Sequence, residues 1–293
     1  MSEASSQPEP LEPLIPLAAE LDAFNAPPAA GESLSIAPPG PPPFGPVIAF
    51  DRVSISFDGR AVLENISFTV DRGHTLCILG RSGVGKSVTL RMLMGFLKPD
   101  SGSIHVEGQE ITGLDEEGLR AIRKRVTMVF QNGALFDSLS VRENVAFPLR
   151  ERGGLAEDQL QQIVDRLIEL VGAEDAIDVL PASLSTGRKR AVAIARALAA
   201  QPEIVLYDEP TTMVDPIIAR RLGNLIQRLK QQRGYTSIVV THDMRVAERL
   251  ADTVLFLDQG QARFLGPLSD FVGSGDSDIQ QFLSLDAYRL PSE

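Results

Sequence analysis

The segment GRSGVGKS at residues 80–87 decides the fold of this chain, because its spacing, G-x-x-x-x-G-K-S, is that of a phosphate-binding loop. Before it, the apolar segment TLCIL at 75–79 predicts a short buried strand. After it, the apolar residues of SVTLRMLMGFL at 87–97 have helical spacing. A strand, this loop and a helix in that order would point backbone N–H groups and the positive end of the helix at one anion. The alternative, a glycine-rich turn with a solvated lysine, does not explain the flanking segments.

The residue types inside the loop each suit phosphate binding. Its three glycines permit the backbone to curl. Lys86 is expected to reach the β- and γ-phosphates, and the Ser87 hydroxyl is expected to bind Mg²⁺. The residues of this segment that we expect to bind nucleotide are Gly80, Arg81, Ser82, Gly83, Val84, Gly85, Lys86, Ser87 and Val88.

Two neighbouring acids, Asp208 and Glu209, follow apolar residues in the segment IVLYDEP at 204–210. A buried strand would present both carboxylates at its carboxyl end, where open α/β sheets bind ligands. We expect Asp208 to hold the Mg²⁺ shell and Glu209 to polarise an attacking water. Two solvated acids at a strand end are the alternative, and the phosphate loop in the same chain argues against it.

Composition limits the class of protein. The net charge of -11 over 293 residues argues against nucleic acid as a partner. The single cysteine, Cys77, cannot form an internal disulfide and fits a reducing compartment. The sequence shows no apolar segment long enough to span a bilayer and no secretion or mitochondrial signal. We therefore expect a cytosolic protein, or one bound to a membrane through another subunit.

The chain divides into three predicted parts. Residues 1–46 are rich in proline, contain acids but no lysine or arginine, and are expected to be disordered, although 17–24 could form a short amphipathic helix. Residues 47–275 alternate strand and helix patterns, which predicts an α/β domain with a mostly parallel sheet. Residues 137–200 are mostly helical in pattern and form a predicted helical subdomain. Residues 276–293 are a C-terminal extension.

Other segments predict individual elements. Alternating patterns at 47–57 and 63–70 indicate an antiparallel strand pair, with a turn over GRAV at 59–62. The segment RVTMVF at 125–130 predicts a buried strand. TVLFLDQGQARFLG at 253–266 predicts a hairpin. Helices are expected near 155–171, 187–199 and 217–232.

Several short motifs, in this order, resemble those of the nucleotide-binding subunits of ABC transporters. They are the phosphate loop, VFQNGALF with Gln131, LSTGR at 184–188, IVLYDEP, TMVD with Asp215, and VVTHD with His242. The resemblance covers about residues 48–275. It implies an ABC-type P-loop NTPase domain that binds and hydrolyses ATP with Mg²⁺. Such a domain has a RecA-like parallel sheet core, an antiparallel β subdomain and a helical subdomain.

The resemblance also implies roles for single residues. Gln131 would sense Mg²⁺, His242 would contact the γ-phosphate, and Phe57 would stack on adenine. Ser185 and Gly187 would contact the γ-phosphate bound to a second copy of the subunit. The expected catalytic residues are Lys86, Gln131, Glu209 and His242, and the expected metal ligands are Ser87, Gln131 and Asp208.

Three positions depart from the family pattern. Thr186 and Arg188 in LSTGR stand where many members have LSGGQ. A β-branched threonine tolerates positive φ poorly, so a reshaped loop and slower turnover are expected. Met213 stands where glycine or alanine is usual.

The sequence around the motifs is most similar to that of the ATPases of Mla/Mce lipid-transport systems. The similar segments are GRSGVGKSVTLRMLMGFLKPDSG, VFQNGALFDSLSVRENVAFPLRE and LYDEPTTMVDPI. This resemblance implies a homodimer on the cytoplasmic face of the bacterial inner membrane, driving a permease that moves phospholipid. A periplasmic MCE-type lipid-binding protein and a small cytoplasmic accessory subunit would be further partners. The alternatives are an importer of amino acids or metals, and a soluble ABC-type ATPase. A GTP-driven switch is not favoured, because no [NT]-K-x-D motif is present.

Overall fold

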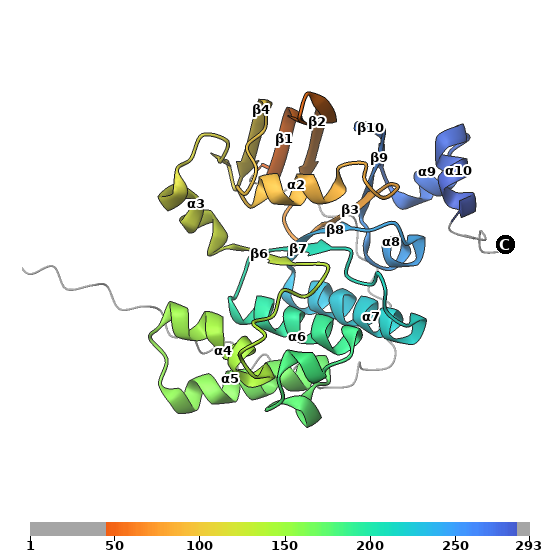
Figure 1. The fold of residues 1–293 in the computed structure, drawn as a ribbon. Coiled ribbons are helices and arrows are strands. Elements are labelled where there is room, and N and C mark those ends of the chain that lie inside the picture. The colour runs from red at the N-terminus through yellow and green to blue at the C-terminus, as the bar shows by residue number, and fades with distance from the viewer. Residues whose placement is uncertain (1–44, 286–293) are drawn as a thin grey trace, which may run out of the picture. The chain divides into compact units, whose positions relative to one another are not determined.

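The computed structural model describes residues 45–285 (Figure 1). Disorder was predicted for residues 1–46, and all of that segment except residues 45 and 46 lies outside the described residues. The short helix considered at 17–24 and the last part of the C-terminal extension, 286–293, lie outside them as well. No helix within 45–285 is long and apolar enough to cross a membrane.

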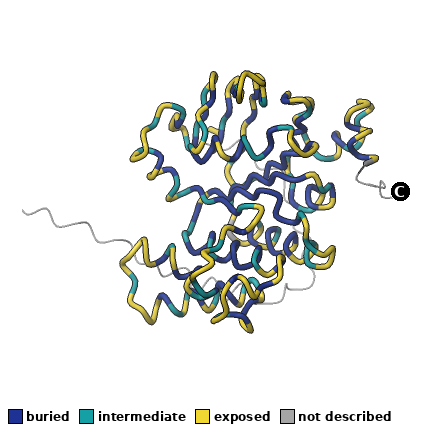
Figure 2. Tube along the Cα trace, in the orientation of Figure 1, coloured by how far each residue is buried: buried dark blue, intermediate teal, exposed yellow. Residues whose placement is uncertain are grey.

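A six-stranded sheet forms the centre of this domain. In spatial order its strands are β10 (Gln261–Gly266), β9 (Thr253–Asp258), β3 (Thr75–Leu79), β8 (Thr236–Val240), β7 (Ile204–Asp208) and β6 (Val126–Val129). Neighbours from β9 to β6 are parallel, and β10 is antiparallel to β9. Every residue of β3, β7 and β8 is buried, as expected of a parallel sheet covered on both faces (Figure 2). The predicted α/β fold and the predicted hairpin at 253–266 are confirmed.

A second, antiparallel sheet has the order β2-β1-β4-β5. Its strands are β1 (Ile48–Phe57), β2 (Arg60–Val70), β4 (Ser101–Val106) and β5 (Gln109–Glu110). The predicted strand pair is confirmed, but the predicted turn over 59–62 is wrong in extent. The connection is the two residues Asp58 and Gly59, whose φ values are 51° and 74°. Two successive left-handed residues match the twist of a tight hairpin, so the strand resumes earlier than expected.

Helices cover both faces of the parallel sheet (Figure 1). Those predicted from periodicity are present as α2 (Lys86–Leu93), α5 (Glu157–Val171), α6 (Thr186–Ala199) and α7 (Pro216–Arg233), and α4 (Val141–Arg152) precedes α5. In α4 a capping box fixes the first turn, with Ser140 and Glu143 each bonding the other's backbone N–H. Helices α4 and α5 pack against α6. The remaining helices are α3 (Glu116–Arg123), η1 (Glu174–Ala176), η2 (Pro181–Ser183), α8 (Met244–Leu250), α9 (Leu268–Val272) and α10 (Ser277–Leu285).

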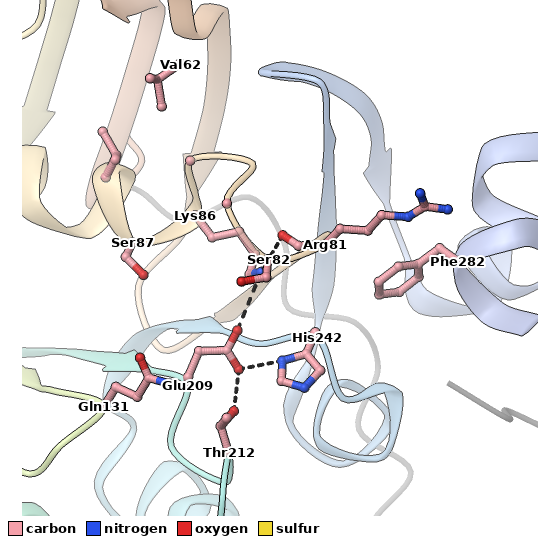
Figure 3. A pocket seen from close by; sticks show the side chains of 13 residues that line it. Val62, Arg81, Ser82, Lys86, Ser87, Gln131, Glu209, Thr212, His242 and Phe282 are labelled. Atoms are coloured by element: carbon pink, nitrogen blue, oxygen red, sulfur yellow. Dashed lines mark hydrogen bonds and ion pairs between the residues drawn. The ribbon is translucent and has the colours of Figure 1, made fainter. Parts of the chain in front are cut away.

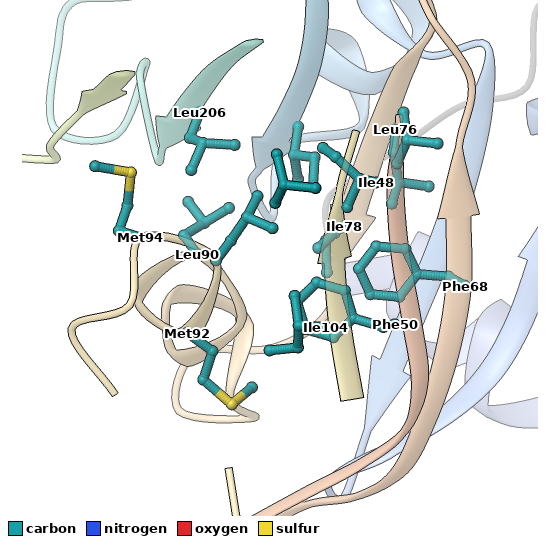
Figure 4. Close-up of a cluster of buried hydrophobic side chains, with 14 of the residues drawn as sticks. Ile48, Phe50, Phe68, Leu76, Ile78, Leu90, Met92, Met94, Ile104 and Leu206 are labelled. Carbon is teal, nitrogen blue, oxygen red and sulfur yellow. The ribbon is translucent and has the colours of Figure 1, made fainter. Parts of the chain in front are cut away.

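The core between the two sheets holds the phosphate loop in place. Helix α2 lies between the sheets, and its Leu90, Met92 and Leu93 are buried among residues of both (Figure 4). On the antiparallel side, Phe50 and Phe68 stack with ring centroids 4.5 Å apart. Burying one such side chain stabilises the fold by about 1.5–3 kcal/mol. The helix that follows the loop is therefore fixed on two sides, and the loop at its N-terminus is fixed with it.

Candidate active site

The loop between β3 and α2 requires glycine at two of its positions. Gly80 has φ 151°, and a Cβ there would lie 2.4 Å from the Leu257 carbonyl oxygen. Gly85, the N-cap of α2, has φ 100°, and its Cβ would lie 2.6 Å from Leu63 Cδ2. Both the backbone conformation and the surrounding atoms exclude a larger side chain. The loop can therefore adopt this conformation only because these residues have no side chain.

We expect Gly80→Ala to lower the midpoint of thermal unfolding more than Gly83→Ala does. A Cβ at Gly80 meets backbone, which cannot give way, whereas a Cβ at Gly83 has no heavy atom within 4 Å. Gly83→Ala thus carries only the cost of its φ of 85°, about 1–2 kcal/mol. Overpacking adds roughly 1–3 kcal/mol at Gly80. Calorimetry on both variants measures the difference, and equal midpoints would contradict this account.

Lys86, the first residue of α2, is buried and turned back over the loop. Its ammonium donates hydrogen bonds to the carbonyls of Gly80 at 2.7 Å and Arg81 at 3.0 Å, and lies 3.5 Å from Glu209 Oε1. Burial lowers the pKa of Lys86, and the attraction of Glu209 opposes that shift. The Lys86 ammonium is thus held against the backbone of the loop.

The Ser87 hydroxyl and the Asp208 carboxylate meet at the edge of the sheet. Ser87 Oγ donates to Asp208 Oδ1 at 2.7 Å. Burial raises the pKa of Asp208, and the hydrogen bond from Ser87 opposes that shift. A hydroxyl and a buried carboxylate side by side are hard oxygen donors of the kind that Mg²⁺ takes while keeping several waters. The residues present therefore fit the predicted metal.

Glu209 lies at the centre of the site in an uncommon backbone conformation, with φ 48°. Its Oε2 accepts a hydrogen bond from Thr212 Oγ1 at 2.7 Å and lies 2.9 Å from His242 Nδ1 (Figure 3). Its Oε1 faces Lys86. A left-handed residue at the end of a strand turns the carboxylate out of the sheet toward these partners. Strain of this kind is found at functional positions.

A cavity of about 460 Å³ opens over these groups (Figure 3). The predicted site residues that line it are Arg81, Ser82, Gly83, Gly85, Lys86, Ser87, Val88, Gln131, Glu209 and His242. Asp208 does not line the cavity, but it accepts a hydrogen bond from Ser87, which does. Gly80 and Val84 do not line the cavity, and Val84 packs against the core instead. The structure thus brings together residues from four separate motifs.

Three lining residues, Val62, Thr212 and Phe282, were not predicted as site residues. Thr212 stands three positions after Glu209, and its hydroxyl could have been found as a partner of that carboxylate. Val62 lies on β2, within the turn predicted at 59–62, and Phe282 lies on α10, within the predicted C-terminal extension. Nothing in their local sequence points to the site.

Phe57 does not line the cavity. It is the last residue of β1, and 41% of its surface is exposed. Its stacking on adenine remains a prediction. An exposed ring at the end of a strand is free to take a base on its face.

We expect Phe57→Ala to raise the Kd for ATP, because loss of one aromatic–base stack costs about 1–3 kcal/mol, or roughly 5- to 150-fold. Titration with a fluorescent ATP analogue measures this. Phe96→Ala is the matched control, since Phe96 is 49% exposed and also lies outside the cavity lining. The same Kd for Phe57→Ala as for the unmodified chain would exclude stacking.

The segment LSTGR forms the start of α6. Ser185 is the N-cap, and its hydroxyl accepts a bond from Arg188 N at 3.4 Å. Thr186 is the first helical residue and does not have positive φ, so the backbone strain that would reshape the loop is absent. Slower turnover remains a prediction. Gly187 packs so tightly on α7 that a Cβ would lie 2.3 Å from Ile218 Cγ2. Neither Ser185 nor Gly187 lines the cavity of its own chain, and their contact with a second chain remains a prediction.

Met213 shows why glycine suits its position in the family. It has φ 62° and is 85% exposed. The backbone there has the left-handed conformation that glycine adopts without strain. The methionine therefore carries a local cost, and its side chain gains no burial within the described residues.

Comparison with known proteins agrees with this geometry. A family model described as ABC transporter matches residues 63–212. The methionine import ATP-binding protein MetN of Brucella abortus (strain 2308) is 39% identical over 236 residues, covering 80% of this chain and 64% of the relative. MetN of Rhizobium johnstonii is 41% identical over 236 residues, covering 78% and 65%. The chain thus spans less than two thirds of the length of these relatives.

Solved structures are similar as well. A dimer of the ATP-binding cassette MJ0796 in a post-hydrolysis state with ADP and Pi has a TM-score of 0.71 and 29% identity, covering 75% of this chain and 98% of the cassette. The structure of cbiO1 from Clostridium perfringens, part of the ABC transporter complex cbiONQ, has a TM-score of 0.71 and 28% identity, covering 82% and 95%. These relatives do not support the narrower expectation of an Mla/Mce lipid-transport ATPase. Together with the family model and the arrangement of the cavity, they show that this chain belongs to the ABC transporter family.

Proposed function

We propose that this chain hydrolyses ATP as the motor subunit of a membrane transporter. The observation that carries the proposal is the meeting of Lys86, the Ser87–Asp208 pair and Glu209 at one cavity. A cation, a pair of hard oxygen donors and a carboxylate are the groups that transfer of a phosphoryl group to water needs. Lys86 and Ser87 are neighbours at the start of α2, and Asp208 and Glu209 are neighbours at the end of β7. Lys86, Ser87 and Glu209 line the same cavity, and Asp208 is bonded to Ser87.

The chain's own groups divide the chemistry among them. The loop N–H groups and Lys86 bind the β- and γ-phosphates and orient them. Glu209 orients a water, whose oxygen forms a bond to the γ-phosphorus as the bond to the bridging oxygen of ADP breaks. His242, 2.9 Å from Glu209 Oε2, lies where it can contact the same phosphate. Mg²⁺, held by Ser87 and Asp208 with Gln131 nearby, would supply neutralisation of phosphate charge.

The working form in this proposal is a homodimer. A cassette similar along nearly its whole length forms a dimer with ADP and Pi. Ser185 and Gly187 lie at the N-terminal end of α6, outside the cavity of their own chain. In a dimer they would complete the site of the other copy, where a helix N-terminus favours phosphate.

An exposed aromatic pair is the proposed contact with a permease. Phe136 and Phe147 are 43% and 38% exposed, with ring centroids 4.8 Å apart. Val141 and Val145, apolar residues of the same segment, are fully buried and belong to the core. Asn144 fixes the loop, accepting from Phe136 N at 2.8 Å and donating to Leu139 O at 2.9 Å. A rigid apolar surface suits an amphipathic cytoplasmic helix of a permease, which would place the subunit on the cytoplasmic face of the bacterial inner membrane.

An imported amino acid is the cargo that we propose first, because the MetN relatives are named for methionine import. Phospholipid transport is the second candidate. It is favoured by the segments around the motifs, such as LYDEPTTMVDPI, and it would bring an MCE-type protein and a small accessory subunit as further partners. The two candidates share the motor and differ in the permease.

Purification from detergent-solubilised membranes tests both parts of this proposal. We expect a permease to co-purify with the unmodified chain and to be lost with Phe136→Asp, while ATP hydrolysis by the isolated subunit persists. Phe96→Asp, which adds the same charge at another exposed phenylalanine, should keep the permease. Vesicles containing the purified complex would then be assayed for uptake of labelled methionine and for movement of labelled phospholipid. Absence of any permease with the unmodified chain would refute the transporter proposal and leave a soluble ATPase.

A further inference from the structure

The turn that carries Glu209 is fastened at both ends by a residue from another element. The four residues 209–212 form a turn in which Thr212 N donates to Glu209 O at 3.3 Å. Arg190, in the second turn of α6, also donates to Glu209 O, from Nη1 at 2.5 Å. Its Nη2 donates to Thr212 O at 2.7 Å. One guanidinium therefore bridges the first and the last carbonyl of this turn.

The environment of Arg190 is unusual for an arginine. The residue is only 3% exposed, and both Nη atoms donate to backbone carbonyls rather than to a carboxylate. Its Nε is buried and has no hydrogen-bond partner among the described residues. Burial lowers the pKa of Arg190, and the charges of Glu209 and Asp208 oppose that shift. Burying a cation with an unsatisfied nitrogen is costly, and lysine could not bridge two carbonyls in a fixed plane.

Both carbonyls that Arg190 binds belong to residues that set the catalytic carboxylate. Glu209 has φ 48°, a conformation that persists only when its surroundings enforce it. The Thr212 hydroxyl donates to Glu209 Oε2 at 2.7 Å. The guanidinium thus holds the backbone of the acid and the backbone of the acid's own hydrogen-bond donor. Arg190 is not itself among the residues that line the cavity, and its hydrogen bonds go to backbone carbonyls and not to the Glu209 carboxylate oxygens.

We propose that Arg190 is a positioning residue for ATP hydrolysis, which acts only through the Glu209–Thr212 turn. It couples the position of α6 to the orientation of the Glu209 carboxylate. This inference rests on the proposed ATPase activity. Helix α6 begins at Thr186, directly after the cap residue Ser185. A second subunit that contacts Ser185 would therefore change the position of Glu209 through this helix and Arg190. Displacement of a catalytic group by about 1 Å can lower a rate by about 100-fold.

A double-mutant cycle with Arg190→Met and Glu209→Gln tests the proposal. We expect Arg190→Met to lower kcat by roughly 10- to 100-fold, with the KM for ATP and the Kd for a non-hydrolysable analogue nearly unchanged. In the Glu209→Gln background the same substitution should lower the residual rate by less than about threefold, because the two residues act as one unit. Arg190→Lys should restore part of the rate, since it keeps the charge and one of the bonds.

Arg123→Met is the matched control, because Arg123 also donates to a backbone carbonyl, that of Met94 at 2.9 Å, but lies on α3, away from the site. It should leave kcat unchanged. An equal loss of rate in both Glu209 backgrounds, or a rise in Kd parallel to the fall in kcat, would show a merely structural role and overturn the proposal. If Arg190→Met fails to fold, the same double-mutant cycle with Arg190→Lys tests whether the effect of position 190 on the rate depends on Glu209. Absence of hydrolysis by the unmodified chain would instead refute the ATPase function itself.

Discussion

Glu209→Gln is expected to lower kcat for ATP hydrolysis by about 10²–10⁴-fold, the range for loss of a positioned general base. The carboxylate has the three partners Lys86, Thr212 and His242, and glutamine keeps its size and one acceptor oxygen. It cannot take a proton or polarise water as a carboxylate does. The Kd for ATP should change little, because the loop and Lys86 supply the phosphate contacts.

Binding without turnover should also leave the dimer closed. Light scattering should therefore detect a dimer of the Glu209→Gln variant in ATP and a monomer without it. Glu203→Gln is the control, since Glu203 precedes the opposite end of the same strand and pairs with Arg72. A Glu209→Gln variant with the normal rate would remove this carboxylate from the mechanism.

Lys86→Ala is expected to weaken ATP binding itself. The ammonium is buried over the loop and makes hydrogen bonds with two of its carbonyls, so it is already oriented before nucleotide arrives. Loss of a hydrogen bond between charged groups costs about 1.5–3 kcal/mol, or roughly 10- to 150-fold in Kd. Isothermal titration with ATP and with AMP distinguishes the loss of a phosphate contact from a disturbed loop, because AMP lacks the phosphates that Lys86 is expected to reach.

AMP affinity should thus be unaffected by Lys86→Ala. Lys98→Ala, at an exposed lysine beyond the end of α2, should leave both affinities unchanged. Weaker binding of AMP and ATP alike would mean that the substitution disturbs the loop rather than removing a phosphate contact.

The sequence by itself determined the local parts of this protein. The loop at 80–87 with its flanking strand and helix, the strand leading to Asp208 and Glu209, and the hairpin at 253–266 were all predicted and observed. Each depends on hydrophobic periodicity or on turn residues within a few positions of one another. The short helix α3 was missed, although Asp115 caps it by accepting from Gly118 N. Its eight residues span too few turns for periodicity to stand out.

Only the tertiary structure decided how these parts meet. Ser87 and Asp208 lie 121 positions apart in the chain and 2.7 Å apart in space, because β3 and β7 both pair with β8. The same assembly places Phe282 at the cavity and Arg190 behind Glu209, and leaves Phe57 outside the lining. Pairing between distant strands and packing between helices depend on surfaces that form only when the chain is folded. A sequence pattern shows which face of an element is apolar, but not which other element will cover it.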